Sequence, residues 1–383
     1  RLKPMRRGPL AVAASAGAWL LSHQSQLFPA SCRWGRRAPR RHSFMAAPWR
    51  QPRARGELPG SHPGGRNSPL AACQAAAVGN PAPLPVAAEG EGAETLFFVH
   101  GWPDDERLWD AQVAHFRSRY RCLRVTMPHF AGRAVAQELG HRLEGYDFLE
   151  AGDLVAATIR AECPGHSVIL VIHDWGCVWG FFAQLRHPEI VKAVVAMDVG
   201  PPSSFPTGLE SWPTVMVAGI AYQHALLSAN ILVRLAAGTR LERSARWFAD
   251  GLVRFMARMF LRGIGDEEDL RSDRITADAC YPYYYFQTNF GVKGAPAASD
   301  EPTPSCPCLF LYGKRKPLAF HSRGWETHLR GRDDCKVVPM ETGHWLQRER
   351  PQEVNRIMEE WLEAMLQHLS EGAGSSAGPR SRL

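Results

Sequence analysis

Six short apolar runs, separated by segments long enough to form helices, constrain the fold of this chain more than any other feature. Continuous runs of Val, Ile, Leu and Phe of this length are typical of strands buried on both faces, as in a mostly parallel sheet that helices cover on each side. Apolar residues between Val354 and Leu366 recur at spacings of three and four, which predicts a final helix packed on the sheet. The sequence therefore predicts an α/β fold. The runs are Thr95 to Val99, Arg121 to Thr126, Ser167 to Ile172, Ala193 to Met197, Cys308 to Tyr312 and Lys336 to Val338.

The regular alternation stops between the fourth and fifth runs. Residues 200–300 contain helical stretches, such as Trp212 to Ala237 and Ala245 to Leu261, but no obvious buried strand. A helical insertion at this point is typical of a cap over the carboxyl edge of the sheet, where α/β folds bind their ligands. We therefore expect a core in two parts, residues 89–199 and 301–370, with a cap over residues 200–300.

The basic character of the chain is confined to its first part. The formal net charge of the 383 residues is +7, yet residues 1–88 contain 13 basic residues and one acid, and the remainder has 32 basic and 37 acidic residues. The leader 1–88 is rich in Arg, Pro, Gly, Ala and Ser, which predicts disorder. Because the folded part is acidic overall, we expect no nucleic-acid partner.

Both ends resemble targeting signals. Basic residues precede an apolar stretch from Leu10 to Leu21 that looks like a signal or transit element, and Met5 or Met45 could be the true start. At twelve residues this stretch is too short to span a bilayer, so no stable membrane span is expected. A Gly/Ser-rich tail, residues 371–383, ends in Ser381-Arg382-Leu383, which resembles a peroxisomal address. A peroxisome and a plastid or mitochondrion therefore remain alternatives.

The nine cysteines are scattered along the chain and include no Cys-x-x-Cys pair and no histidine spacing suited to zinc. Several lie in apolar runs, where a reduced Cys behaves as a small hydrophobic residue. We expect a reducing intracellular compartment and no structural metal.

A reactive carboxylate is predicted where the third run ends, in Ile172-His173-Asp174-Trp175-Gly176-Cys177, with a helical stretch directly after it. A strand, a sharp turn and a helix form a nucleophile elbow, here with Asp174 at its apex. A carboxylate can attack an alkyl carbon and form an ester intermediate. The alternative is that Asp174 only caps the following helix.

Two further motifs occur in the order that such an elbow requires. The first run ends in His100-Gly101-Trp102-Pro103, a loop expected to supply one backbone N–H of an oxyanion hole, with the other coming from Trp175. Gly343-His344-Trp345 follows the last run, in the place of a catalytic histidine. Elbow, oxyanion loop and histidine together favour catalysis over a capping role for Asp174.

With these motifs, residues 94–368 resemble the epoxide hydrolase and haloalkane dehalogenase branch of the α/β-hydrolases. The resemblance implies that Asp174 attacks an epoxide or halogen-bearing carbon and that His344 activates the water that cleaves the ester. Epoxide hydrolases also use two cap tyrosines that donate to the epoxide oxygen. Tyr222 resembles the first, and the second is expected within Tyr281 to Tyr285, where we choose Tyr284.

The chain departs from this family at Lys316, which stands where the triad acid is usually found, in Gly313-Lys314-Arg315-Lys316-Pro317. A lysine cannot stabilise imidazolium, so either the triad is broken or its acid lies elsewhere. Asp198, at the end of the strand after the elbow, is the natural replacement, and some dehalogenases place their acid on that strand. The alternative for Asp198 is a turn cap before Pro201. Three other acids near His344 in sequence are less well placed: Asp333, Asp334 and Glu341.

These features together predict a cofactor-independent hydrolase of small apolar molecules, with water as its second substrate. The two tyrosine positions favour an epoxide hydrolase. A haloalkane dehalogenase is the near alternative, although Trp102 replaces an Asn that often follows His-Gly in that group. A ligand-binding protein that has lost turnover is the alternative from another class, and Lys316 is the residue in its favour. The sequence leaves the oligomeric state open.

Overall fold

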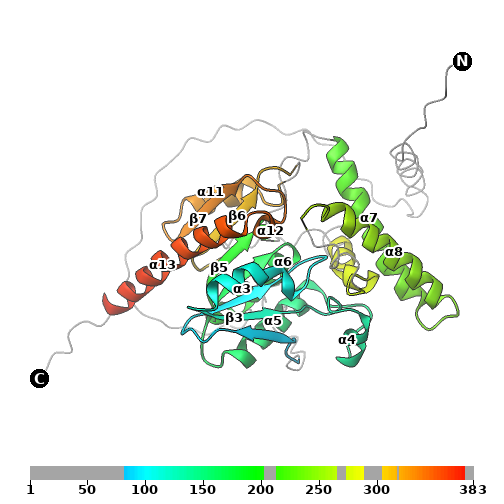
Figure 1. Ribbon diagram of the computed structural model, residues 1–383, viewed down its shortest axis with the longest axis horizontal. Coiled ribbons are helices and arrows are strands. Elements are labelled where there is room, and N and C mark those ends of the chain that lie inside the picture. Colours follow the sequence, from blue (N-terminus) through cyan, green and yellow to red (C-terminus); the bar gives the residue numbers. More distant parts are fainter. Residues whose placement is uncertain (1–81, 202–212, 265–272, 289–303, 317–318, 376–383) are drawn as a thin grey trace, which may run out of the picture. The chain divides into compact units, whose positions relative to one another are not determined.

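A computed structural model describes residues 82–201, 213–264, 273–288, 304–316 and 319–375 (Figure 1). The expectations for residues 1–81 and for the C-terminal Ser381-Arg382-Leu383 fall outside this part of the chain. All described residues belong to one compact unit. The core and the helices of residues 213–288 can therefore be treated as one body.

The described residues form a seven-stranded sheet in the order β1-β3-β2-β4-β5-β6-β7, in which only β1 runs antiparallel to its neighbour. The predicted α/β fold is confirmed, and the six predicted runs match β2 to β7 with ends displaced by at most two residues. The strands are β1 (Val86–Glu89), β2 (Thr95–Val99), β3 (Arg121–Val125), β4 (Val168–His173), β5 (Val191–Met197), β6 (Cys308–Gly313) and β7 (Cys335–Met340).

Strand β1 lies where the sequence predicted the end of a leader without structure. It pairs with β3 at the edge of the sheet, from Val86 opposite Val125 to Glu89 opposite Cys122, and Leu84 before it is buried. The strand has four residues, two of them Ala, and is largely half-buried, so it lacks the apolar run that marks the other strands. The predicted boundary at residue 88 therefore falls inside a strand.

Side chains from alternate positions of the strands build two hydrophobic cores, one on each face of the sheet. One core includes α3 (Asp110–Phe116) and α13 (Pro351–Ser375). The other includes α5 (Phe148–Glu162), α6 (Trp175–Arg186) and α11 (Arg323–Arg330) and continues into the cap. Shorter elements join these layers: η2 (Glu106–Trp109), α4 (Arg133–Glu138), η3 (Pro188–Ile190) and α12 (Leu346–Glu349).

Between β5 and β6 the described residues form helices joined by turns and short loops. The long helices α7 (Pro213–Ala236) and α8 (Glu242–Phe260) pack on each other, and η5 (Ala277–Cys280) and α10 (Tyr281–Phe286) pack on α7 (Figure 1). The two predicted helices correspond to α7 and α8. In the part of the chain that is described, no helix combines the length and apolarity needed to cross a bilayer.

Candidate active site

Asp174 lies on a strained turn between β4 and α6, with a φ of 54° and a ψ of −126°. Two glycines allow the chain to pass close to this turn. A β-carbon on Gly101 would lie 2.4 Å from Asp174 Oδ1, and one on Gly176 would lie 2.4 Å from the Val99 carbonyl oxygen. Because the turn is sharp and the two neighbouring residues are glycines, the Asp174 side chain can project from the carboxyl edge of the sheet.

Backbone N–H groups bind the Asp174 carboxylate. The Trp102 N–H donates to Asp174 Oδ1 at 2.8 Å, and a hydrogen bond from the Trp175 N–H also favours the ionised form. Burial would raise the pKa of Asp174, but hydrogen bonding to His344 and the charge of that residue outweigh burial and lower it. The two N–H groups expected to form an oxyanion hole therefore converge on the nucleophile.

His344 lies between two carboxylates. Its Nε2 is 3.2 Å from Asp174 Oδ2, and its Nδ1 donates a short hydrogen bond to Asp198 Oδ2. Burial disfavours the imidazolium, but the charge of Asp198 and hydrogen bonds to both carboxylates raise the pKa of His344 to about 9. Asp174, His344 and Asp198, which are far apart in the sequence, thus form one continuous chain of contacts.

Asp198 is fully buried at the end of β5 and has a positive φ of 72°. Its Oδ1 accepts a hydrogen bond from the Gly313 N–H at 2.9 Å and lies 3.0 Å from the ammonium of Lys316. Burial opposes ionisation, but the charges of Lys316 and His344 lower the pKa of Asp198 to about 2. Lys316, at the usual place of the acid, is therefore the counter-ion of Asp198.

Two tyrosines of the cap lie near the nucleophile. The rings of Tyr222 and Tyr283 are 6.1 Å apart, and Tyr283 stands edge-on to Trp175 at 5.2 Å and to Trp102 at 5.7 Å. Burial and the charge of Asp174 raise the pKa of Tyr222 to about 12, and burial raises that of Tyr283 as well. Both phenols are therefore neutral proton donors at neutral pH.

The geometry favours Tyr283 over Tyr284, the residue predicted from the sequence. Its ring lies 4.1 Å from the Arg234 guanidinium, outside the Trp102, Trp175 and Tyr222 cluster that Tyr283 joins. The sequence Tyr281-Pro282-Tyr283-Tyr284-Tyr285 has no apolar periodicity, so only the orientation of α10 determines which ring faces the core.

Known proteins are similar to this chain in sequence and in fold. A sequence model of the alpha/beta hydrolase family matches residues 96–357, which is more than half of the chain. The chain belongs to the alpha/beta hydrolase family. Within it, this hydrolase is similar to Epoxide hydrolase 3 of Xenopus tropicalis, with 24% identity over 70% of this chain and 71% of that one. A haloalkane dehalogenase of Sphingobium indicum is 34% identical over 29% of this chain and 36% of its own length. The relatives place the hydrolase in the branch expected from its sequence.

Solved structures share the hydrolase's fold. A structure described as a putative epoxide hydrolase from Pseudomonas aeruginosa superposes with a TM-score of 0.55 at 18% sequence identity. The superposition covers 74% of this hydrolase and 92% of that chain. At this identity the likeness concerns the fold alone.

Two buried histidines of the hydrolase support the site, and the sequence did not single them out. The ring of His173, beside the nucleophile, lies tilted against that of His344 with the centroids 4.6 Å apart, and its Nε2 donates to the His344 carbonyl oxygen at 3.0 Å. His100 accepts from the Met127 N–H through Nε2, so its Nδ1 donates to the Gly101 carbonyl oxygen. Burial lowers the pKa of both, to about 3 for His173, so both are neutral and position the loops around Asp174.

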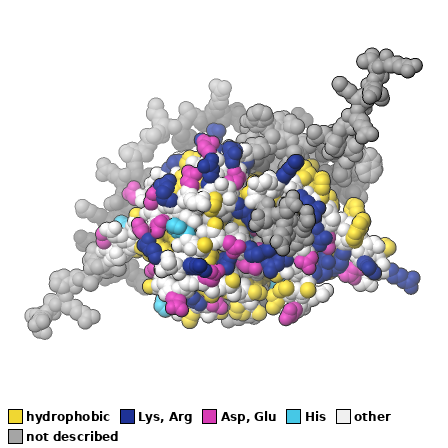
Figure 2. Space-filling model, viewed as in Figure 1, with side chains coloured by type: hydrophobic (Ala, Val, Ile, Leu, Met, Phe, Trp, Pro, Cys, Tyr) yellow, Lys and Arg dark blue, Asp and Glu magenta, His cyan; other side chains and the backbone are white. Residues whose placement is uncertain are grey.

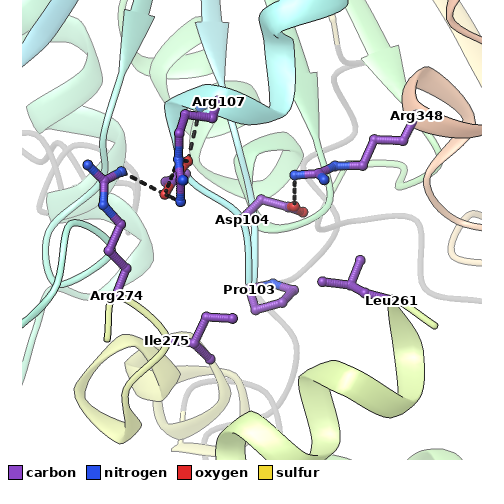
Figure 3. A pocket seen from close by; sticks show the side chains of 8 residues that line it. Pro103, Asp104, Arg107, Leu261, Arg274, Ile275 and Arg348 are labelled. Carbon is purple, nitrogen blue, oxygen red and sulfur yellow. Dashed lines mark hydrogen bonds and ion pairs between the residues drawn. The ribbon is translucent and has the colours of Figure 1, made fainter. Parts of the chain in front are cut away.

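Ion pairs connect the loop that follows β2 to the cap and to the segment that follows His344. Arg274 lies 2.7 Å from Asp105, and Arg348 lies 3.1 Å from Asp104. Figure 3 shows Arg274 and Arg348 on opposite sides of a small cavity that Pro103 and Ile275 also line. Asp104 also accepts from the Trp345 indole at 2.8 Å. These contacts hold three segments around the nucleophile in one arrangement.

Metal ligands are not assembled in the part of the hydrolase that the structure describes, where no group of three or more His, Cys, Asp or Glu side chains could hold an ion. The described cysteines are free thiols.

Proposed function

We propose that this hydrolase opens epoxides of small apolar molecules through an ester on Asp174. The observation that carries the proposal is the chain of contacts from Asp174 through His344 to Asp198, with the Trp102 N–H on the other oxygen of the nucleophile. In the first step Asp174 Oδ2 attacks an epoxide carbon. The carbon–oxygen bond of the ring breaks, and a tyrosine proton passes to the departing oxygen.

Tyr222 and Tyr283 are the proton donors of this proposal. Their raised pKa values keep the protons on the phenols until the epoxide oxygen gains charge. The aromatic surroundings of Trp102, Trp175 and Tyr283 suit an apolar substrate. This pair of phenols favours an epoxide over a haloalkane, because a departing halide needs no proton.

His344 changes its role during the cycle. In the free enzyme two carboxylates stabilise its imidazolium, so it cannot act as a base near neutral pH. Esterification removes the negative charge of Asp174 and lowers the pKa of His344, so the imidazolium proton passes to the tyrosinate and the neutral ring can accept a proton from water. Hydroxide adds to the ester carbonyl, and the N–H groups of Trp102 and Trp175 stabilise the charge on Oδ1. Collapse breaks the bond between the carbonyl carbon and the alkyl oxygen, and the proton of the new Asp174 carboxylic acid passes to that oxygen, so the diol leaves and the carboxylate is restored. Water is the only other reactant, and no cofactor takes part in these steps.

Lys316 does not argue for a non-catalytic binding protein. A broken triad would leave His344 Nδ1 without a carboxylate, whereas Asp198 is bonded to it. The buried lysine neutralises part of the charge that a relocated acid brings into the core.

Trapping the ester tests the proposal. His344→Ala should still form the ester and should fail to hydrolyse it, so intact mass after incubation with an aryl epoxide should rise by the mass of one epoxide. Peptide mapping should place the adduct on Asp174. His321→Ala, which removes a buried histidine next to Tyr312, is the matched control and should accumulate no adduct.

The alternatives give different results in the same assay. Halide release from haloalkanes together with no epoxide adduct would assign a dehalogenase. Saturable epoxide binding with no adduct in any variant would assign a binding protein.

A further inference from the structure

Helix α8, which is part of the cap, exposes large apolar side chains on the face opposite to the one that packs on the rest of the molecule. Its opposite face packs on the body through small residues, since Ala245, Ala249, Val253 and Ala257 are all buried. Apolar groups of this size on one helix face are unusual on a soluble surface and mark an interaction site. The exposed side chains are Trp247 (80% exposed), Met259 (61%), Phe248 (60%) and Phe255 (57%), with Leu241 at the start of the helix.

The same face is hollowed. Gly251 lies one helical turn from both Trp247 and Phe255, and a β-carbon on it would meet no atom within 4 Å. The rings of Trp247 and Phe255 therefore flank Gly251, which has no side chain. These residues and several arginines line a surface hollow of about 680 Å³. A helix-weakening Gly at the centre of an exposed face fits a surface shaped to receive a ligand.

The charge around this face is positive. Arg133 and Arg246 are held by the buried carboxylates of Asp250 and Asp278. Figure 2 shows dark-blue and yellow side chains interleaved on the side of the molecule where α8 lies. Four more arginines around α8 are exposed, and no carboxylate among the described residues pairs with them: Arg240, Arg243, Arg258 and Arg262.

We propose that the exposed face of α8 docks this chain on an anionic phospholipid bilayer. An interfacial helix uses Trp, Phe and Leu for the acyl boundary and Arg for the headgroups, which is the composition found here. A second copy of this chain is a poor partner for the face, because the arginines of two such faces would repel each other. The basic leader would be repelled by the same arginines. An anionic bilayer satisfies both the apolar and the basic side chains.

The catalytic site lies on the other side of α8. Phe260, at the end of the helix, has its ring 5.1 Å from that of Tyr222 and 6.5 Å from that of Trp102. Because Phe260 follows Ala257 by three residues and Val253 by seven, it belongs to the packed stripe of α8, and the exposed face is turned away from these rings. Docking itself does not depend on the proposed chemistry.

Vesicle sedimentation of the full chain tests the docking. The protein should bind vesicles of phosphatidylcholine with phosphatidylserine and should bind pure phosphatidylcholine at least tenfold more weakly, with the difference shrinking as salt is raised. Trp247→Ser with Phe255→Ser, and separately Arg243→Glu with Arg258→Glu, should each lower binding at least tenfold. Leu139→Ser with Leu185→Ser, and Arg356→Glu, alter exposed residues elsewhere and should leave binding unchanged.

Circular dichroism and thermal melting verify that each variant is folded, and the readout needs no turnover, so a failed epoxide assay does not affect it. Absence of wild-type binding to anionic vesicles overturns the proposal, as does equal loss in the control variants. Sedimentation equilibrium supplies the other decisive result: a wild-type dimer that Trp247→Ser with Phe255→Ser converts to a monomer would assign the face to a second copy.

Discussion

Asp198 shows how a residue can replace a missing partner from a neighbouring strand. The carboxyl ends of β5 and β6 are adjacent in the sheet, so an acid at the end of either strand can reach the same histidine. Here the acid stands on β5 and a lysine on the β6 side pairs with it. His344 Nδ1 thus meets a carboxylate that follows β5, while the lysine of the β6 side lies on the other oxygen of that carboxylate.

Asp198→Asn should slow ester hydrolysis by roughly 10³- to 10⁴-fold, because an amide cannot stabilise the imidazolium that forms on His344. Ester formation should persist, so single-turnover measurements should show a burst followed by a stalled second phase. The single variant leaves Lys316 buried without its carboxylate, so Asp198→Asn with Lys316→Met serves as the folding control. Unchanged turnover in both variants would remove Asp198 from the triad.

Lys316→Met should preserve ester hydrolysis within about tenfold and move its rising pH limb to higher pH. Loss of the ammonium leaves the full charge of Asp198 facing His344, which stabilises the imidazolium and raises the pH at which the ring becomes a base. His173, Asp174 and Asp198 also face this ring and are unaltered. Lys314→Met, an exposed neighbour paired with Glu341, is the control, and a limb that stays in place or moves down would contradict the prediction.

The proton donors can be told apart by removing single hydroxyl groups. Tyr222→Phe and Tyr283→Phe should each lower kcat/KM for an epoxide by about 10²-fold, as expected for loss of a general acid. Tyr284→Phe, whose ring faces Arg234, should remain within about twofold of wild type. Steady-state kinetics on one aryl epoxide compares the three. A large effect at Tyr284 with none at Tyr283 would assign the second proton donor to Tyr284, as predicted from the sequence.

At the scale of elements, the sequence predicted what depends on composition and order. The six apolar runs located six strands, and the motifs at their ends located Asp174, His344 and Asp198 at the edge where they meet. Strand β1 was missed because an edge strand with half-buried residues carries no apolar run. Tyr283 was missed because the phase of the short α10 depends on tertiary packing.

The attachment of the cap depends on buried charges that no sequence pattern revealed. Arg133, from α4, lies 3.0 Å from Asp250 of α8 and 2.8 Å from Asp278 of η5, and Arg246 adds a second contact to Asp278. Arg246 and Asp250 lie four residues apart on α8, whereas Arg133 and Asp278 are distant from them in the sequence, and each residue in isolation resembles an ordinary surface charge. Together these ion pairs join α4 of the core to α8 and η5 of the cap.

Asp278→Asn should lower the free energy of unfolding by about 3 kcal/mol, because it leaves two guanidinium groups next to a neutral amide in a buried site. Urea unfolding followed by circular dichroism measures the change. Glu360→Gln removes an exposed charge that pairs with Arg356 on α13 and should cost less than about 0.5 kcal/mol. Equal losses in the two variants would show that the buried cluster contributes no more than a surface pair.

At the scale of the whole molecule, the buried histidines determine how stability depends on pH. Burial lowers the pKa of five histidines, to about 4 for His141 and about 3 for His173, and the other three are His100, His129 and His321. Between these values and 6.5 the unfolded chain binds more protons than the folded chain, so stability falls as the pH is lowered below about 6.5. His344 has the opposite sign. Its pKa is raised to about 9, so its contribution is complete below 6.5 and is lost as the pH rises through 9.

The free energy of unfolding should therefore be greatest near pH 6.5 and fall more steeply on the acid side. Each proton of difference changes stability by about 1.4 kcal/mol per pH unit, and five histidines act in acid where one acts in base. Asp105 and Asp198, whose pKa values are lowered to about 2, add to the loss only below about pH 4, as they become protonated. Urea midpoints at about pH 5, 6.5 and 8 measure the asymmetry, and His344→Gln should flatten the basic side alone. A profile that falls equally on both sides would mean that the buried histidines gain protons without unfolding the chain.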